Sequence, residues 1–256
     1  MADDAPKTDN GPKTAALISR PILRTLERVL PFAVMLVIAV GWFVSIQYKN
    51  AIERAVISSY QETQLEIVRA VARSTNYVVQ DMIEKGRSIG DIEQVIFKRL
   101  VEPVRLLQNG DAWIYAPDHV VFDLSSDFPD EYRGKSMAQI FATQVKKGAS
   151  HYEAVTDDVM SAREGVGWYI WLPEKGKEIA AWTPVRLGTH VWTIGMSTPL
   201  PEILRATNAA QQTRVLFIVM TLATIFGLIL SLLAIWGGAR NRRLALALHE
   251  RNRELQ

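Results

Sequence analysis

Two long uncharged apolar runs, one near each end of this 256-residue chain, constrain its fold more than any other feature. Residues 29–48 and residues 215–239 contain no Asp, Glu, Lys or Arg. A helix rises about 1.5 Å per residue, so each run can cross the roughly 30 Å hydrocarbon layer of a bilayer. A buried helix of a soluble protein is rarely apolar on all sides for so long. We therefore expect two transmembrane helices.

A cleavable signal peptide is the alternative interpretation of the first run. A long tail, residues 1–28, precedes this run, and no small-x-small cleavage motif follows it. We therefore expect the first run to remain in the membrane, in contact with lipid.

Arginines flank both runs on the sides that face the chain ends, at Arg20, Arg24, Arg28, Arg240, Arg242 and Arg243. The positive-inside rule then places both termini in the cytoplasm and the middle of the chain outside. We expect a cytoplasmic tail (residues 1–28), a first membrane helix (29–48) and an extracytoplasmic domain (49–214). A second membrane helix (215–239) and a cytoplasmic signalling helix (240–256) follow.

Composition excludes several classes of protein. The formal net charge of +2 is too small for a nucleic-acid-binding domain. The absence of cysteine excludes disulfides, thiolate metal sites and cysteine nucleophiles, and no two of the four histidines have the spacing of a zinc site. The sequence contains neither a nucleophile elbow nor a glycine-rich phosphate loop. We therefore expect no catalytic site, no metal, no cofactor and no nucleic-acid partner.

The extracytoplasmic part begins with helical patterns. Residues 51–85 lack glycine and proline and repeat apolar residues at helical spacing, which predicts one long helix that ends near Gly86. A second amphipathic helix is predicted between Asp91 and Pro103, and a third around residues 137–147.

Five short segments rich in aromatic and β-branched residues are separated by turn residues. The first two, residues 112–116 and 120–123, predict a hairpin, and the other three, residues 168–172, 178–185 and 190–197, predict consecutive antiparallel strands. The sequence therefore predicts an α+β fold: a long N-terminal helix packed on a five-stranded antiparallel sheet, flanked by two transmembrane helices.

A polar connection, residues 124–167, separates the predicted hairpin from the three later strands. Connections this long are more often functional than idle. In a sheet with helices on one side, such a connection would cap the other side and enclose a ligand pocket.

Residues 122–137 read FDLSSDFPDEYRGKSM, an expected strand that leads into an acidic loop and a Gly-Lys turn. Within residues 165–203, an aromatic strand ending in Trp171-Leu172-Pro173 is followed by a paired strand and then by a strand with Trp192-Thr193-Ile194-Gly195. These stretches resemble the single-Cache, PAS-like, extracytoplasmic sensor family of two-span bacterial receptors. The resemblance covers roughly residues 50–210 and is strongest over residues 111–203.

The chain departs from the pattern of this family at two places. Asp118-His119 stand where family members often have Asp-Gly, and Ser197-Thr198 stand where a tyrosine often follows the glycine strand. These departures concern the ligand more than the fold.

The resemblance implies a signal-transduction receptor in the inner membrane of a bacterium, acting as a homodimer. Its PAS-like outer domain would bind a small solute, and many members of the family bind a carboxylate. The signal would pass through the second membrane helix to a cytoplasmic output domain such as a histidine kinase. A diguanylate cyclase and a chemoreceptor are the alternative outputs.

Five side chains are candidates for binding the solute. Strand alternation places Tyr169 and Trp171 on one face, and Trp182 on the next strand is expected to be their cross-strand partner. Tyr115 in the first hairpin is a candidate of the same kind. The planar guanidinium of Arg133 suits a carboxylate. A place in the core is the alternative for each aromatic residue, and a solvated position is the alternative for the arginine.

The segment after the second run predicts a helix that begins a coiled coil, because Leu244, Leu248 and Leu255 lie at heptad-like spacing. If the stretch from Ile203 to Leu255 is helical throughout, a small displacement of the extracytoplasmic domain could pass through the second membrane helix to the output domain.

A membrane-anchored module that docks a partner protein is the alternative function. A receptor should enclose Tyr169, Trp171 and Trp182, whereas a docking module should expose them as one patch of several hundred square ångströms.

Overall fold

The computed structural model describes residues 20–121, 132 and 134–254 of the chain. Contacts between Cα atoms divide the chain into two compact units. One unit is Lys49–Thr213, and the other consists of the two chain ends, up to Tyr48 and from Arg214 onward.

One long helix, α1 (Arg20–Glu84), contains the first apolar run and continues into the unit Lys49–Thr213. It ends where the sequence predicts, because Gly86 adopts a left-handed conformation with φ 69°. The backbone N–H groups of Gly86 and Arg87 donate to the carbonyls of Ile83 and Met82, at 2.9 and 3.1 Å. These bonds satisfy the last carbonyls of the helix, as in many glycine-terminated helices.

Two helices of the chain-end unit are long and apolar enough to cross a membrane, α1 and α6 (Ala209–Glu254). Their large apolar side chains are exposed instead of forming a core, for example Phe32 at 79%, Val37 at 71% and Leu232 at 65%. Such a surface suits lipid better than water. Composition and exposure thus agree with the expectation of two membrane helices.

The two helices contact each other through small residues and one polar pair. The indole N–H of Trp42 donates to the hydroxyl of Thr224 at 2.9 Å, and the Trp42 ring stacks on Phe217. A Cβ atom added to Gly227 would lie 2.7 Å from Ile38, so this glycine lets the helices approach closely. Small residues and interhelical hydrogen bonds serve the same purpose in membrane helices generally.

The unit Lys49–Thr213 contains a five-stranded antiparallel sheet with strand order β1-β2-β5-β4-β3. In chain order the strands are β1 (Arg105–Leu106), β2 (Gly110–Tyr115), β3 (Gly165–Tyr169), β4 (Glu178–Leu187) and β5 (His190–Pro199). The α+β class, the long N-terminal helix and the antiparallel five-stranded sheet are therefore confirmed.

The predicted strand over residues 120–123 is wrong for the residues that the structure describes there. Val120 forms a single bridge with Tyr115, and the N–H of Ala116 donates to the carbonyl of His119 across a tight turn. The edge position next to β2 belongs instead to the two-residue strand β1. Glu202 stabilises the turn between β1 and β2, because its carboxylate accepts from the N–H groups of Gln108 and Asn109 at 2.6 and 3.2 Å.

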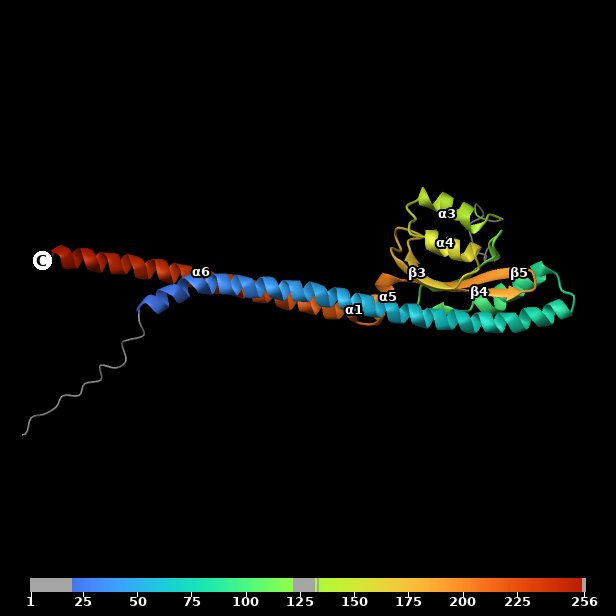
Figure 1. Cartoon of the computed structure of the whole chain (residues 1–256), viewed down its shortest axis with the longest axis horizontal. Coiled ribbons are helices and arrows are strands. Elements are labelled where there is room, and N and C mark those ends of the chain that lie inside the picture. The colour runs from blue at the N-terminus through green and yellow to red at the C-terminus, as the bar shows by residue number, and fades with distance from the viewer. Residues whose placement is uncertain (1–19, 122–131, 133, 255–256) are drawn as a thin grey trace, which may run out of the picture. The chain divides into compact units, whose positions relative to one another are not determined.

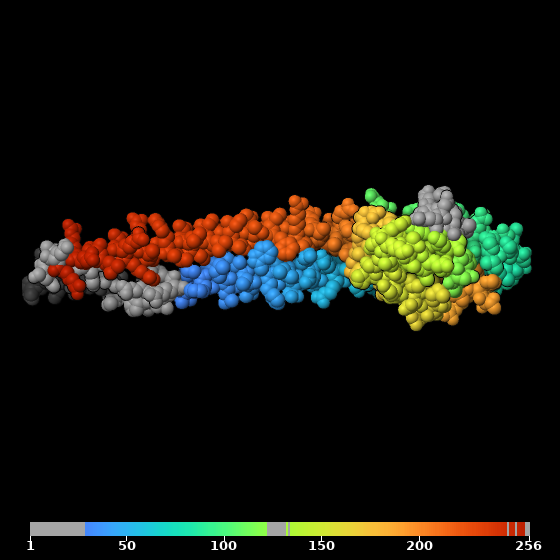
Figure 2. Space-filling model, turned by 90° about the horizontal axis from the view of Figure 1, so that it is seen from above, coloured from blue at the N-terminus to red at the C-terminus, as the bar shows by residue number. Residues whose placement is uncertain are grey.

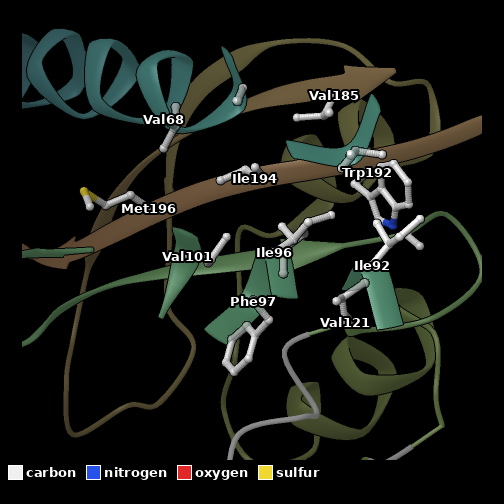
Figure 3. Close-up of a cluster of buried hydrophobic side chains, with 14 of the residues drawn as sticks. Val68, Ile92, Ile96, Phe97, Val101, Val121, Val185, Trp192, Ile194 and Met196 are labelled. Carbon is white, nitrogen blue, oxygen red and sulfur yellow. The ribbon is translucent and has the colours of Figure 1, made fainter. Parts of the chain in front are cut away.

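On one face of the sheet, helical residues form a hydrophobic core. α1 contributes Val68 and Val79, and α2 (Ile89–Ile96), which Ser88 caps, runs into a π-helical turn, η1 (Phe97–Val101). Figure 3 shows this core, which gathers side chains of β5 with those of the helices, among them Val68, Ile92, Ile96, Phe97, Val101, Trp192, Ile194 and Met196. This face holds the sheet on α1.

On the other face of the sheet lie α3 (Met137–Val145) and α4 (Glu153–Met160), as the yellow-green segments of Figures 1 and 2 show. Ser136 and Gln139 begin α3 with a capping box. The third predicted helix is thus present as α3. The predicted capping connection also contains α4, for which no helix was predicted. This layer covers the site described below.

Within the described residues, the helix that a relay through the second membrane helix would need from Ile203 onward is interrupted. α5 (Leu200–Ala206) ends before Thr207, and α6 begins at Ala209. Asn208 between them has φ 57°, a left-handed conformation that interrupts the helix. Leu244 and Leu248 are exposed on α6, and Leu255 lies outside the described residues.

Candidate functional site

A layer of aromatic side chains fills the space between the sheet and the α3–α4 cover. We call it the aromatic cluster; it consists of Trp113, Tyr115, Tyr132, Phe141, Tyr152, Tyr169, Trp171 and Trp182. β2, β3 and β4 contribute residues from the sheet, and α3 contributes Phe141 from the cover.

Glycines on neighbouring strands make room for the two largest rings. Trp113 lies opposite Gly195 in the register of β2 and β5, and its ring covers the place where a Cβ atom of Gly195 would be. A Cβ atom at Gly165 or Gly167 would lie 2.8 or 2.9 Å from the ring of Trp182. Strand glycines often mark such close approaches. Both indoles are therefore held flat against the sheet.

Phe141 joins the rings of the cover to those of the sheet. It stacks on Tyr152 with 4.3 Å between centroids, and it meets Trp171 edge-on at 5.2 Å and Tyr169 at 6.4 Å. Edge-on and offset arrangements of this kind add about 0.5–1.5 kcal/mol per pair beyond area burial. The cluster is thus a packed set of rings with defined geometry.

A carboxylate lies within this aromatic surrounding. Glu178 begins β4, is directly opposite Tyr169 in the sheet register, and is only 4% exposed. Burial raises the pKa of its carboxyl to about 7, and the charge of Asp111 adds to the rise. The charge of Lys175 and a hydrogen bond from the backbone N–H of Trp171 act in the opposite direction. Burial dominates because it penalises the ionised form.

Two buried tyrosine hydroxyls lie within the electrostatic field of Glu178. Burial raises the pKa of Tyr115 and of Tyr169, and the charge of Glu178 raises both further. Ser197 hydrogen-bonds the Tyr169 hydroxyl and partly offsets this rise in its pKa. Both tyrosines therefore remain neutral and can donate or accept hydrogen bonds inside the cluster.

The indole N–H of Trp113 is buried beside the hydroxyl of Tyr169 and, like Ser197, lowers the pKa of that hydroxyl against the effect of burial.

Four of the five predicted site residues come together in the aromatic cluster, namely Tyr115, Tyr169, Trp171 and Trp182. The fifth, Arg133, lies outside the described residues. Two details differ from the expectation. Trp182 pairs across strands with Gly165 instead of Tyr169, and its N–H already donates to Asp158 at 3.2 Å. Trp182 is therefore a packing residue more than a ligand donor.

Glu178 and Trp113 were not among the site residues predicted from the sequence. A signal for Glu178 was present, since the alternation along residues 178–185 places it on the same strand face as Ala180 and Trp182. An acidic residue on the face of a predicted buried aromatic is unusual, because unpaired acids are seldom fully buried.

Two glutamines of α1 bind the backbone of the strands that carry the cluster. The Nε2 group of Gln61 donates to the carbonyl of Gly167 at 3.0 Å, two residues before Tyr169. Gln64 is fully buried and donates to the carbonyl of Ile179 and the hydroxyl of Thr198, at 3.1 and 2.9 Å. α1 is thus connected to β3, β4 and β5 by direct hydrogen bonds.

A second polar group lies on the opposite face of the sheet. Glu93 accepts from the indole N–H of Trp192 at 2.8 Å, and a ring nitrogen of His119 lies 3.0 Å from the same carboxylate. The other ring nitrogen of His119 lies 2.8 Å from Asp118. Across the described part of the chain, no three His, Asp or Glu side chains are arranged to hold a metal ion.

Comparisons of the chain with protein-family models, with curated proteins and with solved structures gave no match.

Proposed function

We propose that this chain is the sensor part of a bacterial membrane receptor. In this proposal the unit Lys49–Thr213 is an extracytoplasmic, PAS-like Cache domain that binds a small solute at the aromatic cluster. The observation that carries the proposal is the aromatic cluster itself, with the buried carboxylate of Glu178 between a sheet and a helical cover. Apolar sites with a few convergent polar groups are the usual form of small-molecule sites.

The burial of the aromatic residues favours a receptor over a docking module. Tyr169 and Trp182 are 7% and 2% exposed, and Trp171 is half-buried. These rings therefore do not form the exposed patch by which a docking surface would recognise a protein. A small solute that enters the cluster is the occupant that such a closed arrangement suits.

Signal transfer in this proposal uses helices that belong to both units. α1 continues without interruption from Arg20 to Glu84, and Gln61 and Gln64 connect it to the strands of the cluster. A solute that shifts β3 would change these hydrogen bonds and bias α1 towards one of two positions. Such couplings typically amount to about 1–3 kcal/mol. In a homodimer, α6 would carry the change to an output domain such as a histidine kinase.

A thermal-shift experiment on the full chain in lipid nanodiscs tests the binding proposal. The panel contains small acids, amines and amino acids, and a solute at 100 times its Kd should stabilise the folded state by about 2.7 kcal/mol. Trp171→Ala should remove the shift. Tyr77→Ala should keep it, because Tyr77 is 79% exposed on α1. A panel in which no solute stabilises the wild-type chain would contradict the proposal.

The proposed topology has both termini in the cytoplasm and can be tested by labelling, because the chain has no cysteine of its own. Ser161→Cys introduces one exposed thiol in the unit Lys49–Thr213, and Asn252→Cys introduces one near the end of α6. A membrane-impermeant maleimide should label the first thiol in spheroplasts and the second only after permeabilisation. The reverse labelling pattern would show the opposite orientation.

A further inference from the structure

The carboxylate of Glu178 is buried without an ion-pair partner among the described residues. Lys175 acts on it through its charge, but no lysine or arginine nitrogen of the described chain lies within ion-pair distance. An ionised carboxylate out of water is costly unless a positive charge or several hydrogen bonds compensate it. The site therefore has a place for a positive charge that the described residues do not supply.

Ring faces of this unit already receive ammonium groups. The Nζ atom of Lys177 lies 4.1 Å from the ring centroid of Trp168, and that of Lys147 lies 5.3 Å from the ring centroid of Tyr132. Tyr132 itself belongs to the aromatic cluster. An ammonium group near aromatic faces gains about 0.5–2 kcal/mol, most when it is desolvated. Rings that surround a carboxylate therefore form an environment suited to an organic cation.

The remaining polar groups fit the same ligand. The hydroxyls of Tyr115 and Tyr169 and that of Ser197 can accept hydrogen bonds from an ammonium group. Glu178 and the hydroxyls thus divide the roles of charge partner and hydrogen-bond acceptors.

We infer that the aromatic cluster takes a small organic solute with a protonated amine, and that Glu178 is the charge partner of that amine. The inference rests on the proposed receptor function and names its ligand class. It differs from the carboxylate ligand expected from the sequence at Arg133, because the described residues of the cluster offer a buried acid and no guanidinium.

The pH dependence of binding follows from the groups that face Glu178. These are Tyr169 of β3, Asp111 and Tyr115 of β2, and Lys175 before β4. Burial gives the free carboxyl a pKa of about 7, so below that pH an amine must displace a proton to bind. The apparent Kd of an amine should therefore rise about tenfold from pH 8 to pH 6. A carboxylate ligand would show the opposite trend.

The test measures apparent Kd values by thermal shift on the full chain in nanodiscs. Ethylamine, ethanolamine, choline and glycine are the ammonium probes, and acetate, lactate and succinate are the anionic probes. At least one ammonium probe should bind the wild-type chain at pH 8, and its apparent Kd should be about tenfold higher at pH 6. Glu178→Gln should raise the apparent Kd of that probe at least tenfold at pH 8, because the amide has no charge.

Glu93→Gln is the matched control, since Glu93 is a buried acid on the opposite face of the same sheet, 9% exposed. It should keep the affinity for the ammonium probe. Unchanged amine affinity in Glu178→Gln would overturn the inference. Binding of anionic probes alone would overturn it too, while leaving the receptor proposal intact. If neither class of probe stabilises the wild-type chain, both the inference and the receptor proposal are wrong.

Discussion

Replacement of Glu178 by glutamine should make the folded chain more stable at neutral and alkaline pH. Burial raises the pKa of this carboxyl from 4.5 to about 7. A raised pKa means that the folded state binds the proton more tightly than the unfolded state does. The contribution of the group to the free energy of unfolding is therefore full below pH ~4.5 and is lost as the pH rises through 7.

The magnitude follows from the same two values. A shift of about 2.5 units at 1.36 kcal/mol per unit gives about 3 kcal/mol of lost stability above pH 7. Glutamine has nearly the same shape, does not ionise, and can still accept the hydrogen bond from the backbone N–H of Trp171. Glu178→Gln should therefore be more stable than the wild type by up to about 3 kcal/mol at pH 8, and equally stable at pH 4.5.

Thermal unfolding of the full chain in nanodiscs, followed by tryptophan fluorescence, measures this difference. For a domain of this size, about 3 kcal/mol corresponds to a rise in Tm of about 6–12 °C. Glu62→Gln is the matched control, because Glu62 is exposed on α1, and it should leave Tm unchanged at both pH values. If Glu178→Gln were no more stable than the wild type at pH 8, the carboxylate would be compensated in the folded state, and our account of its burial would be wrong.

Three further predictions concern other parts of the unit Lys49–Thr213. Gly195→Ala should destabilise the fold by about 1–3 kcal/mol in chemical denaturation, because the new methyl group would overlap the ring of Trp113. Glu202→Ala should cost about 2 kcal/mol in the same assay, since it leaves the N–H groups of the β1–β2 turn without their acceptor. Burial lowers the pKa of His119, but hydrogen bonds and charges of its acidic neighbours outweigh burial and raise it overall. The wild type should therefore lose stability relative to His119→Asn as the pH rises above about 6.5, measured as the difference in Tm between pH 5 and pH 9. A constant difference in Tm would argue against a charged histidine at Glu93.

Features set by local sequence could be predicted well. The absence of glycine and proline from residues 51–85, followed by Gly86, correctly indicated where α1 ends. The alternating residues of β4 and β5 and the turn at Gly188, where φ is 59°, indicated the central hairpin. In these segments the conformational preference of each residue agrees with the fold around it.

Features set by distant contacts could not be predicted in this way. β1 has two residues, and Glu202, far along the chain, stabilises the turn beside it. Glu178 could be placed on a strand face from the alternation, but its burial depends on β3 and on the cover. The break at Asn208 had a local signal, since asparagine tolerates left-handed backbone better than most residues, but the surrounding apolar helix pattern obscured it.

The fit of each tryptophan to its glycines constrains how the sequence of this domain can change during evolution. A larger residue at Gly165 or Gly167 would collide with Trp182, and a smaller residue at Trp182 would leave a cavity over both glycines. A substitution at only one of these positions thus gives a less stable protein, whereas simultaneous substitutions at the tryptophan and a glycine need not. We therefore expect these three positions to vary together or not at all among related chains, so that correlated substitution would trace the β3–β4 pairing.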